Sequence, residues 1–383
     1  FSGLFLFLSL WRPSGAAFLL YFKGGPVKKL RNYLFRNLLL LAILLSLAIP
    51  VDASPLSFPD VPVTSSLYDS VSYLAEQGIT AGTGEGRFSP EQLITARQWA
   101  VMLCRAYQVE TVGETWAEKS GNSVAAACRK GWLNEGDVRA PDTKLCRGTL
   151  YESAFAAAGI PVYDARLYDG SAKPSAYGSV MRAGQELKLW KDGESPDALV
   201  NRGEAAWLLH AVLTQSFSVE PPAAGVAMEN PSEVFANDYL LELRRVPESI
   251  LDAFNQAGWT YSIDFDYLSA LSQQLGMKCI GATDYVRKTI YVSDARATLH
   301  EFGHFLNWTL TASAEREELY RLEAQNTVLR AYARTNYREY FADCFDYWII
   351  NAGNAQRMER FRDAMPRTYA YFERLAENHW GLK

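Results

Sequence analysis

The chain has 383 residues, and its formal net charge of −5 excludes the strongly basic surface typical of nucleic-acid-binding proteins. Its 49% hydrophobic and 13% aromatic residues exclude a disordered chain, and its length predicts two or three globular domains. The five cysteines are an odd number without a C-x-x-C spacing, so neither a cysteine zinc site nor a disulfide framework is indicated. A Cys128–Cys146 bond stays open for a secreted protein, although free thiols are the preferred interpretation.

The N-terminal segments predict a signal for secretion. Residues 1–26 begin with Phe and are interrupted by Pro and Gly, and we interpret them as an extension that precedes the true start of translation near Val27. A basic run at 28–36, an apolar run at 38–49 and the small-residue site Val51-Asp52-Ala53 predict a signal peptide over residues 27–53. The alternative is a pair of membrane helices. The first interpretation predicts a secreted protein without a stable membrane span.

Residues 57–215 predict three helical repeats with a period of about 50 residues, at 57–108, 112–159 and 160–215. Each repeat reads as a helix, a Gly-rich turn and a second helix. Because one such pair cannot bury its apolar face alone, the three are expected to stack into one bundle.

These repeats resemble the S-layer homology (SLH) domain, with Phe58-Pro59-Asp60-Val61 as the best-matching stretch. The resemblance implies anchoring to a secondary cell-wall polymer, with Arg147, Arg202 and Asp60 as candidate polymer-binding residues. Guanidinium groups suit an acidic sugar because their planar fork matches a carboxylate. The alternative is that these arginines only cap or solvate the starts of helices.

Residues 216–231 read as a linker rich in Pro and Ala, and residues 232–383 as a second domain. This domain is expected to begin with helices near 235–243 and 247–258. A strand at 259–265, a helix at 267–275 and a strand pair within 281–292 follow. A long charged helix at 313–333, a helix from 336 to 350 and closing helices over 354–375 complete it. The whole chain is thus predicted to be mainly α with a small β-sheet.

His300-Glu301-Phe302-Gly303-His304 is an H-E-x-x-H pattern. On a helix, the two imidazoles share one face and suit a Zn²⁺ ion, while the Glu is placed as a general base. The alternative is an ordinary buried helix whose histidines are satisfied by hydrogen bonds. The chain's other histidines, His210 and His379, lie in the repeats and at the C-terminal end, so neither is a good third ligand.

A catalytic zinc site needs a third protein ligand, and Glu339 is the preferred candidate. Asp343 follows it by one helical turn and is expected to orient a zinc-bound His. The alternative for Glu339 is a capping box with Asn336.

Together with Glu339-Tyr340-Phe341-Ala342-Asp343, the motif resembles the catalytic domain of the anthrax lethal factor family of zinc metallopeptidases, which includes secreted Pro-Pro endopeptidases. The resemblance implies an α+β zincin-type domain in which Tyr332 donates its hydroxyl to the substrate oxyanion. Tyr337 is a rival for that role, and packing alone is the alternative for Tyr332.

The sequence therefore predicts a secreted, cell-wall-anchored zinc endopeptidase that acts on extracellular or surface proteins, proline-rich proteins among them. The alternative is a wall-binding SLH protein whose peptidase-like domain is inactive and serves as an adhesin or scaffold.

Overall fold

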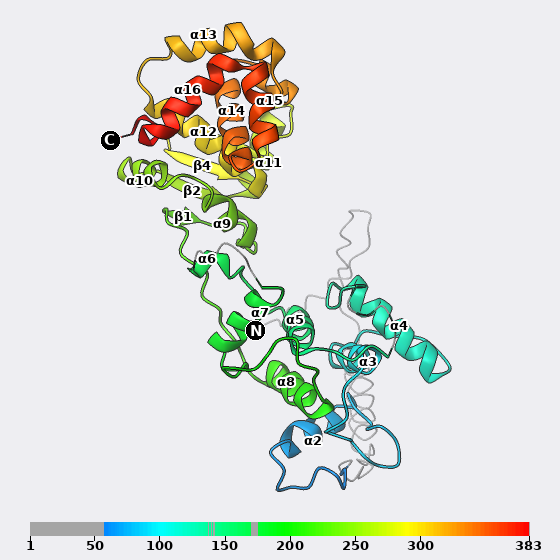
Figure 1. Ribbon diagram of the computed structural model, residues 1–383. Helices are drawn as coiled ribbons and strands as arrows, with labels where there is room; N and C mark the ends of the chain where they lie inside the picture. The colour runs from blue at the N-terminus through cyan, green and yellow to red at the C-terminus, as the bar shows by residue number, and fades with distance from the viewer. Residues whose placement is uncertain (1–56, 137, 139, 141, 170–174, 383) are drawn as a thin grey trace, which may run out of the picture. The chain divides into compact units, whose positions relative to one another are not determined.

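The computed structural model describes residues 57–382 apart from 137, 139, 141 and 170–174. The predicted extension at 1–26 and the predicted signal peptide at 27–53 lie outside the described residues. The described part is mainly helical with one small mixed sheet (Figure 1), which confirms the predicted fold class. It holds one hydrophobic cluster built from residues 58–212 and a second built mainly from residues 224–382.

Two main helices fall within each of the three predicted repeats. The second helices of the first and third repeats begin at capping side chains: Thr95 forms a capping box with Gln98, and the Asn201 side chain accepts from Glu204 N. The helices of this region are α2 (Tyr68–Glu76), α3 (Ala96–Ala106), α4 (Trp116–Arg129), α5 (Arg147–Ala158), the short α6 (Arg166–Asp169), α7 (Gly178–Glu186) and α8 (Arg202–Thr214).

A closed ring of backbone hydrogen bonds joins the three repeats. Ile94 N donates to Val200 O (3.1 Å), Val200 N to Leu145 O (3.1 Å), and Leu145 N to Ile94 O (3.2 Å). Each of these residues lies two positions before the second helix of its repeat. Equivalent segments of three similar units therefore meet at one point, as expected when the repeats bury their apolar faces together.

The C-terminal region contains a four-stranded sheet in the order β1-β2-β4-β3. Strands β1 (Met228–Glu229), β2 (Thr260–Ile263) and β4 (Thr289–Val292) are parallel, and β3 (Gly281–Asp284) pairs antiparallel with β4. The β-branched and aromatic residues of β2 and β4 are largely buried, as expected of central strands. This order leaves β3 at one edge of the sheet.

Helices pack against this sheet, and α12 and α14 lie side by side (Figure 1). A Cβ atom on Gly303 would stand 2.7 Å from Ala342 Cα, so only Gly lets the two backbones approach this closely. Buried Arg316 donates to the carbonyls of Asn307 and Leu310 at the end of α12. The α-helices are α9 (Asn237–Leu243), α10 (Glu248–Gln256), α11 (Phe265–Leu275), α12 (Thr298–Thr309), α13 (Ala314–Glu323), α14 (Tyr337–Asn351), α15 (Ala355–Ala364) and α16 (Pro366–Glu377), and the 3₁₀ turns are η1 (Ala295–Ala297), η2 (Ala324–Asn326), η3 (Ala331–Arg334) and η4 (His379–Gly381).

Two predicted boundaries differ from the structure. The long helix expected over 313–333 ends at Glu323 and continues as the short turns η2 and η3. Beyond it, the Thr327 hydroxyl accepts from Leu329 N, a local turn that competes with helix. The last part of the predicted linker, Met228–Glu229, forms strand β1 beside β2, and Met228 packs against the second hydrophobic cluster.

Candidate metal centre and catalytic site

Helix α12 presents the two histidines of the motif on one buried face. His300 and His304 are four residues apart, and their rings meet edge to face with centroids 4.7 Å apart. Both residues are less than one-tenth exposed. The structure therefore brings the two imidazoles together as the sequence predicts.

Helix α14 brings a carboxylate to the same point. Glu339 Oε2 lies 3.1 Å from His300 Nε2 and 3.2 Å from His304 Nε2, and the two nitrogens lie 3.1 Å from each other. The three residues form a group with metal-ligand chemistry, in which the ligand atoms all lie within 4.8 Å of one another. Two imidazole nitrogens and one carboxylate oxygen are a ligand set that catalytic zinc uses.

The hydrogen bonds and the pKa of His300 also suit a bound cation. Asp343 Oδ1 lies 2.7 Å from His300 Nδ1, so this carboxylate accepts the Nδ1 proton, and Nε2, which faces the other two ligands, is the nitrogen that would bind an ion. Burial lowers the pKa of His300, but the hydrogen bonds with Asp343 and Glu339 raise it to about 10. The site thus favours positive charge, which a divalent ion would supply through His300, His304 and Glu339.

Glu339 is also at the start of a capped helix. The Asn336 side chain accepts from Arg338 N and Glu339 N, so the cap weighed as an alternative is present. The carboxylate itself faces the imidazoles rather than the backbone of Asn336. Burial raises the pKa of Glu339, yet the contacts with His300 and His304 outweigh this and lower it far below the usual range.

Glu301, the predicted base, is 5% exposed and is held by the edge strand. Thr283 Oγ1 donates to Glu301 Oε2 at 2.7 Å. A Cβ atom on Gly281 would stand 2.5 Å from Glu301 Oε1 and 2.9 Å from Ala297 Cβ, so any larger residue here would displace the carboxylate or α12. The carboxylate therefore lies between two residues of β3.

Tyr332 lies beside the same group, with its ring centroid 6.1 Å from that of His300. Burial, together with the charges of Glu339 and Glu301, raises the pKa of Tyr332 to about 12, so the phenol keeps its proton and can donate it. Tyr337, the rival candidate, borders the same cavity and accepts a hydrogen bond from Arg338 Nε at 3.3 Å.

These groups line a cavity of about 470 Å³. Its walls come from the end of α11, from β3, from α12 and from the start of α14. The residues that line it are Leu271, Leu275, Met277, Cys279, Gly281, Ala282, Thr283, Tyr285, His300, Glu301, His304, Tyr332, Asn336, Tyr337, Arg338 and Glu339.

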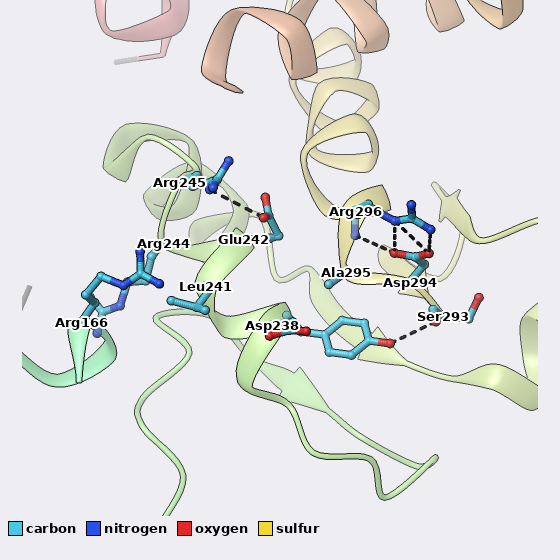
Figure 2. A pocket seen from close by; sticks show the side chains of 11 residues that line it. Arg166, Asp238, Leu241, Glu242, Arg244, Arg245, Ser293, Asp294, Ala295 and Arg296 are labelled. Carbon is cyan, nitrogen blue, oxygen red and sulfur yellow. Dashed lines mark hydrogen bonds and ion pairs between the residues drawn. The ribbon is translucent and has the colours of Figure 1, made fainter. Parts of the chain in front are cut away.

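A larger hollow, of about 820 Å³, is bordered by α9 and residues 293–296. No His or Cys is among the described residues that line it. Figure 2 shows two ion pairs among its charged side chains, Asp294 with Arg296 and Glu242 with Arg245. The smaller cavity is therefore the candidate active site.

Sequence reasoning missed two polar side chains of this site. Thr283 lies on the edge strand, and Arg330 precedes η3 and pairs with Asp343, with Nη2 2.6 Å from Oδ1. No local pattern distinguishes either residue, because each meets its partner only through the fold. Of the other histidines, His210 bonds through Nδ1 with Ser70 Oγ at 3.0 Å.

The three candidate polymer-binding residues have different surroundings. Asp60 accepts from Phe88 N and Ser89 N with its two oxygens. Arg147 forms a forked pair with Glu204, with its Nε and Nη2 2.7 and 3.1 Å from the two oxygens.

Arg202 donates through Nε to Phe88 O and is 3% exposed. It borders a hollow of about 410 Å³ together with Arg105, Gln98 and Trp116. Of the three candidate residues, only Arg202 is among the side chains that border this hollow.

Comparison with known proteins gives three findings. Residues 57–95 match the family model of the S-layer homology domain, which confirms the resemblance seen in the first repeat. An S-layer protein of Bacillus thuringiensis subsp. finitimus is 39% identical over 56 residues, which cover 15% of this chain and 7% of that protein. The solved structure of a Pro-Pro endopeptidase from Paenibacillus alvei is 18% identical, with 39% of this chain and 96% of that chain covered and a TM-score of 0.31.

The chain therefore spans only about 7% of the length of the curated relative that it matches. Within the described residues, no helix combines the length and the apolar content of a membrane span. What the findings establish is an S-layer homology domain at residues 57–95.

Proposed function

We propose that the protein is a secreted zinc endopeptidase that is anchored to the bacterial cell wall through its S-layer homology repeats. The single observation that carries the enzymatic part is the convergence of His300 Nε2, His304 Nε2 and Glu339 Oε2 from two helices. Glu301 lines the same cavity, so a base stands beside the ligand group.

His300, His304 and Glu339 would hold the ion, with Asp343 fixing the tautomer of His300. Bound zinc supplies a Lewis acid that lowers the pKa of water and polarises a carbonyl. Glu301 accepts the proton of the attacking water and returns it to the leaving amine. The Tyr332 phenol donates a hydrogen bond to the oxygen on which negative charge develops.

The test compares the purified wild-type chain with its Glu301→Gln variant. Wild type is expected to retain about one zinc per chain after dialysis and to cleave members of a peptide library. The variant keeps the zinc and loses turnover by several powers of ten, within the ~10²–10⁴-fold that a positioned acid–base group contributes. A folded wild-type chain without bound metal would instead support the inactive adhesin or scaffold. Equal turnover in both proteins would refute the assignment of Glu301.

Wall anchoring is supported by the family match at residues 57–95 and by the hollow bordered by Arg202 and Arg105. Cationic side chains at a concave surface suit an acidic polymer. We expect the protein to sediment with isolated cell walls that keep their secondary polymer and to stay in solution when the polymer has been removed. Equal sedimentation with both preparations would count against polymer recognition.

A further inference from the structure

We propose that Arg330 is a positioning residue that couples the oxyanion donor Tyr332, through Asp343, to the metal ligand His300. The proposal rests on the proposed peptidase function and assigns a role within that site. Nothing in the local sequence around Arg330 indicates it, since the residue lies in the irregular segment between α13 and α14.

The first half of the coupling is a short ionic bridge. Arg330 Nε lies 3.0 and 2.9 Å from the two oxygens of Asp343, and Nη2 lies 2.6 Å from Oδ1. The same Oδ1 accepts from His300 Nδ1 at 2.7 Å. One carboxylate oxygen is thus shared by the arginine and the imidazole. Since Asp343 is only 3% exposed, its position depends on these two partners.

The second half is a contact between a guanidinium and an aromatic ring. The Arg330 guanidinium lies 5.3 Å from the ring centroid of Tyr332, within the range of a cation–π interaction. Tyr332 is 40% exposed and sits on a 3₁₀ turn of four residues. Short 3₁₀ turns have weak hydrogen-bond geometry, so such a turn needs side-chain contacts to hold an aromatic residue in place.

The two halves meet in one side chain. Its fork holds the Asp343 carboxylate beside His300, and Nη2 lies 3.1 Å from His300 Nδ1 itself. Its guanidinium also contacts the ring of Tyr332, whose hydroxyl is to donate to the substrate. Arg can do both because the guanidinium is planar, carries several donors and stacks on aromatic rings, whereas Lys offers a single point charge. The charges of the site favour the same role for Arg330. Glu301, Glu339 and Asp343 place acidic oxygens around two imidazoles, and Arg330 adds a positive charge without being a metal ligand.

The experiment compares wild type with Arg330→Met, which removes the fork and keeps the length, and with Arg330→Lys, which keeps only the charge. Arg321→Met is the matched control, since Arg321 pairs with Glu318 at 2.6 Å on the exposed face of α13, outside the site. Amide hydrogen exchange over residues 329–336 is measured on the zinc-free proteins. Zinc dissociation constants are then measured, together with kcat and KM for a cleaved peptide.

We expect faster exchange over 329–336 in Arg330→Met but not in Arg321→Met. Loss of a partner behind a ligand typically lowers metal affinity or activity ~10–100-fold, so kcat at saturating zinc should fall in that range while KM changes little. Arg330→Lys should recover part of kcat. In a Tyr332→Phe background, Arg330→Met should cost less than it does in wild type, because the two residues act together.

Unchanged exchange over 329–336 in Arg330→Met would overturn the coupling, whether or not the protein cleaves peptides. Losses of kcat that multiply independently in the double variant would overturn it as well. If wild type binds no zinc and cleaves nothing, the proposed peptidase function fails, and the exchange measurement still decides whether Arg330 holds the segment that carries Tyr332.

Discussion

Replacement of Gly303 by Ala tests how the site depends on the contact between α12 and α14. The added Cβ would stand 2.7 Å from Ala342 Cα and 3.0 Å from Ala342 O, whereas ordinary contact begins at 3.4 Å. The helices must therefore separate by about 0.7 Å, and overpacking of this kind costs ~1–3 kcal/mol. The gain in helix propensity from Gly to Ala returns ~1 kcal/mol. A net loss of stability of ~0–2 kcal/mol is expected.

The effect on the site should exceed the effect on stability. Gly303 lies next to His304, and Ala342 lies next to Asp343, so a separation of the helices moves both histidines away from Glu339. Misplacement by ~1 Å can cost a site about 100-fold. We expect zinc affinity, measured by competition with a chelator, to fall by ~10–100-fold, while circular dichroism stays that of the folded protein.

Gly121→Ala is the matched control. Gly121 lies inside α4, and a Cβ atom there would meet nothing within 4 Å. This change should raise stability by ~0.5–1 kcal/mol and leave zinc affinity unaltered. Wild-type zinc affinity in Gly303→Ala would refute the reasoning that close packing of the two helices sets the ligand geometry.

Three further predictions concern single side chains. Thr283→Val removes the hydrogen bond to Glu301, and kcat should drop ~10-fold with zinc content unchanged, whereas Thr283→Ser should restore it; equal kcat in Val and Ser variants would contradict this. Tyr332→Phe should lower kcat by ~10²–10³-fold with little change in KM, and a loss confined to KM would exclude the oxyanion role. Burial raises the pKa of Asp60, but hydrogen bonds from Phe88 N and Ser89 N outweigh it and lower that pKa. Its stabilisation is therefore present above the unfolded pKa and is lost as pH falls through the folded value. The difference in melting temperature between wild type and Asp60→Asn should shrink from pH 7 to pH 3, and a constant difference would refute the assignment.

The sequence by itself determined the features that depend on neighbours along the chain. The spacing of His300 and His304 places both imidazoles on one face of a helix because the α-helix repeats every 3.6 residues. The capping side chain of Asn336 and the branched residues of β2 and β4 likewise follow from local preferences. The motif Phe58-Pro59-Asp60-Val61 also indicated the S-layer homology domain from neighbouring residues alone, because a short family motif is a pattern along the chain.

Only the tertiary structure decided which groups from distant segments meet. The preference for Glu339 over other carboxylates rested on its place on a capped helix and on the need for a third zinc ligand. Its oxygen reaches the imidazoles because Gly303 lets α14 approach α12. Thr283 and Arg330 contact Glu301 and Asp343 across the fold, and no periodicity along the chain encodes such contacts. The end of α13 at Glu323 also involves a contact with a distant segment. The Glu323 carboxylate accepts from the first backbone N–H groups of α16, a partner that helix propensity does not contain.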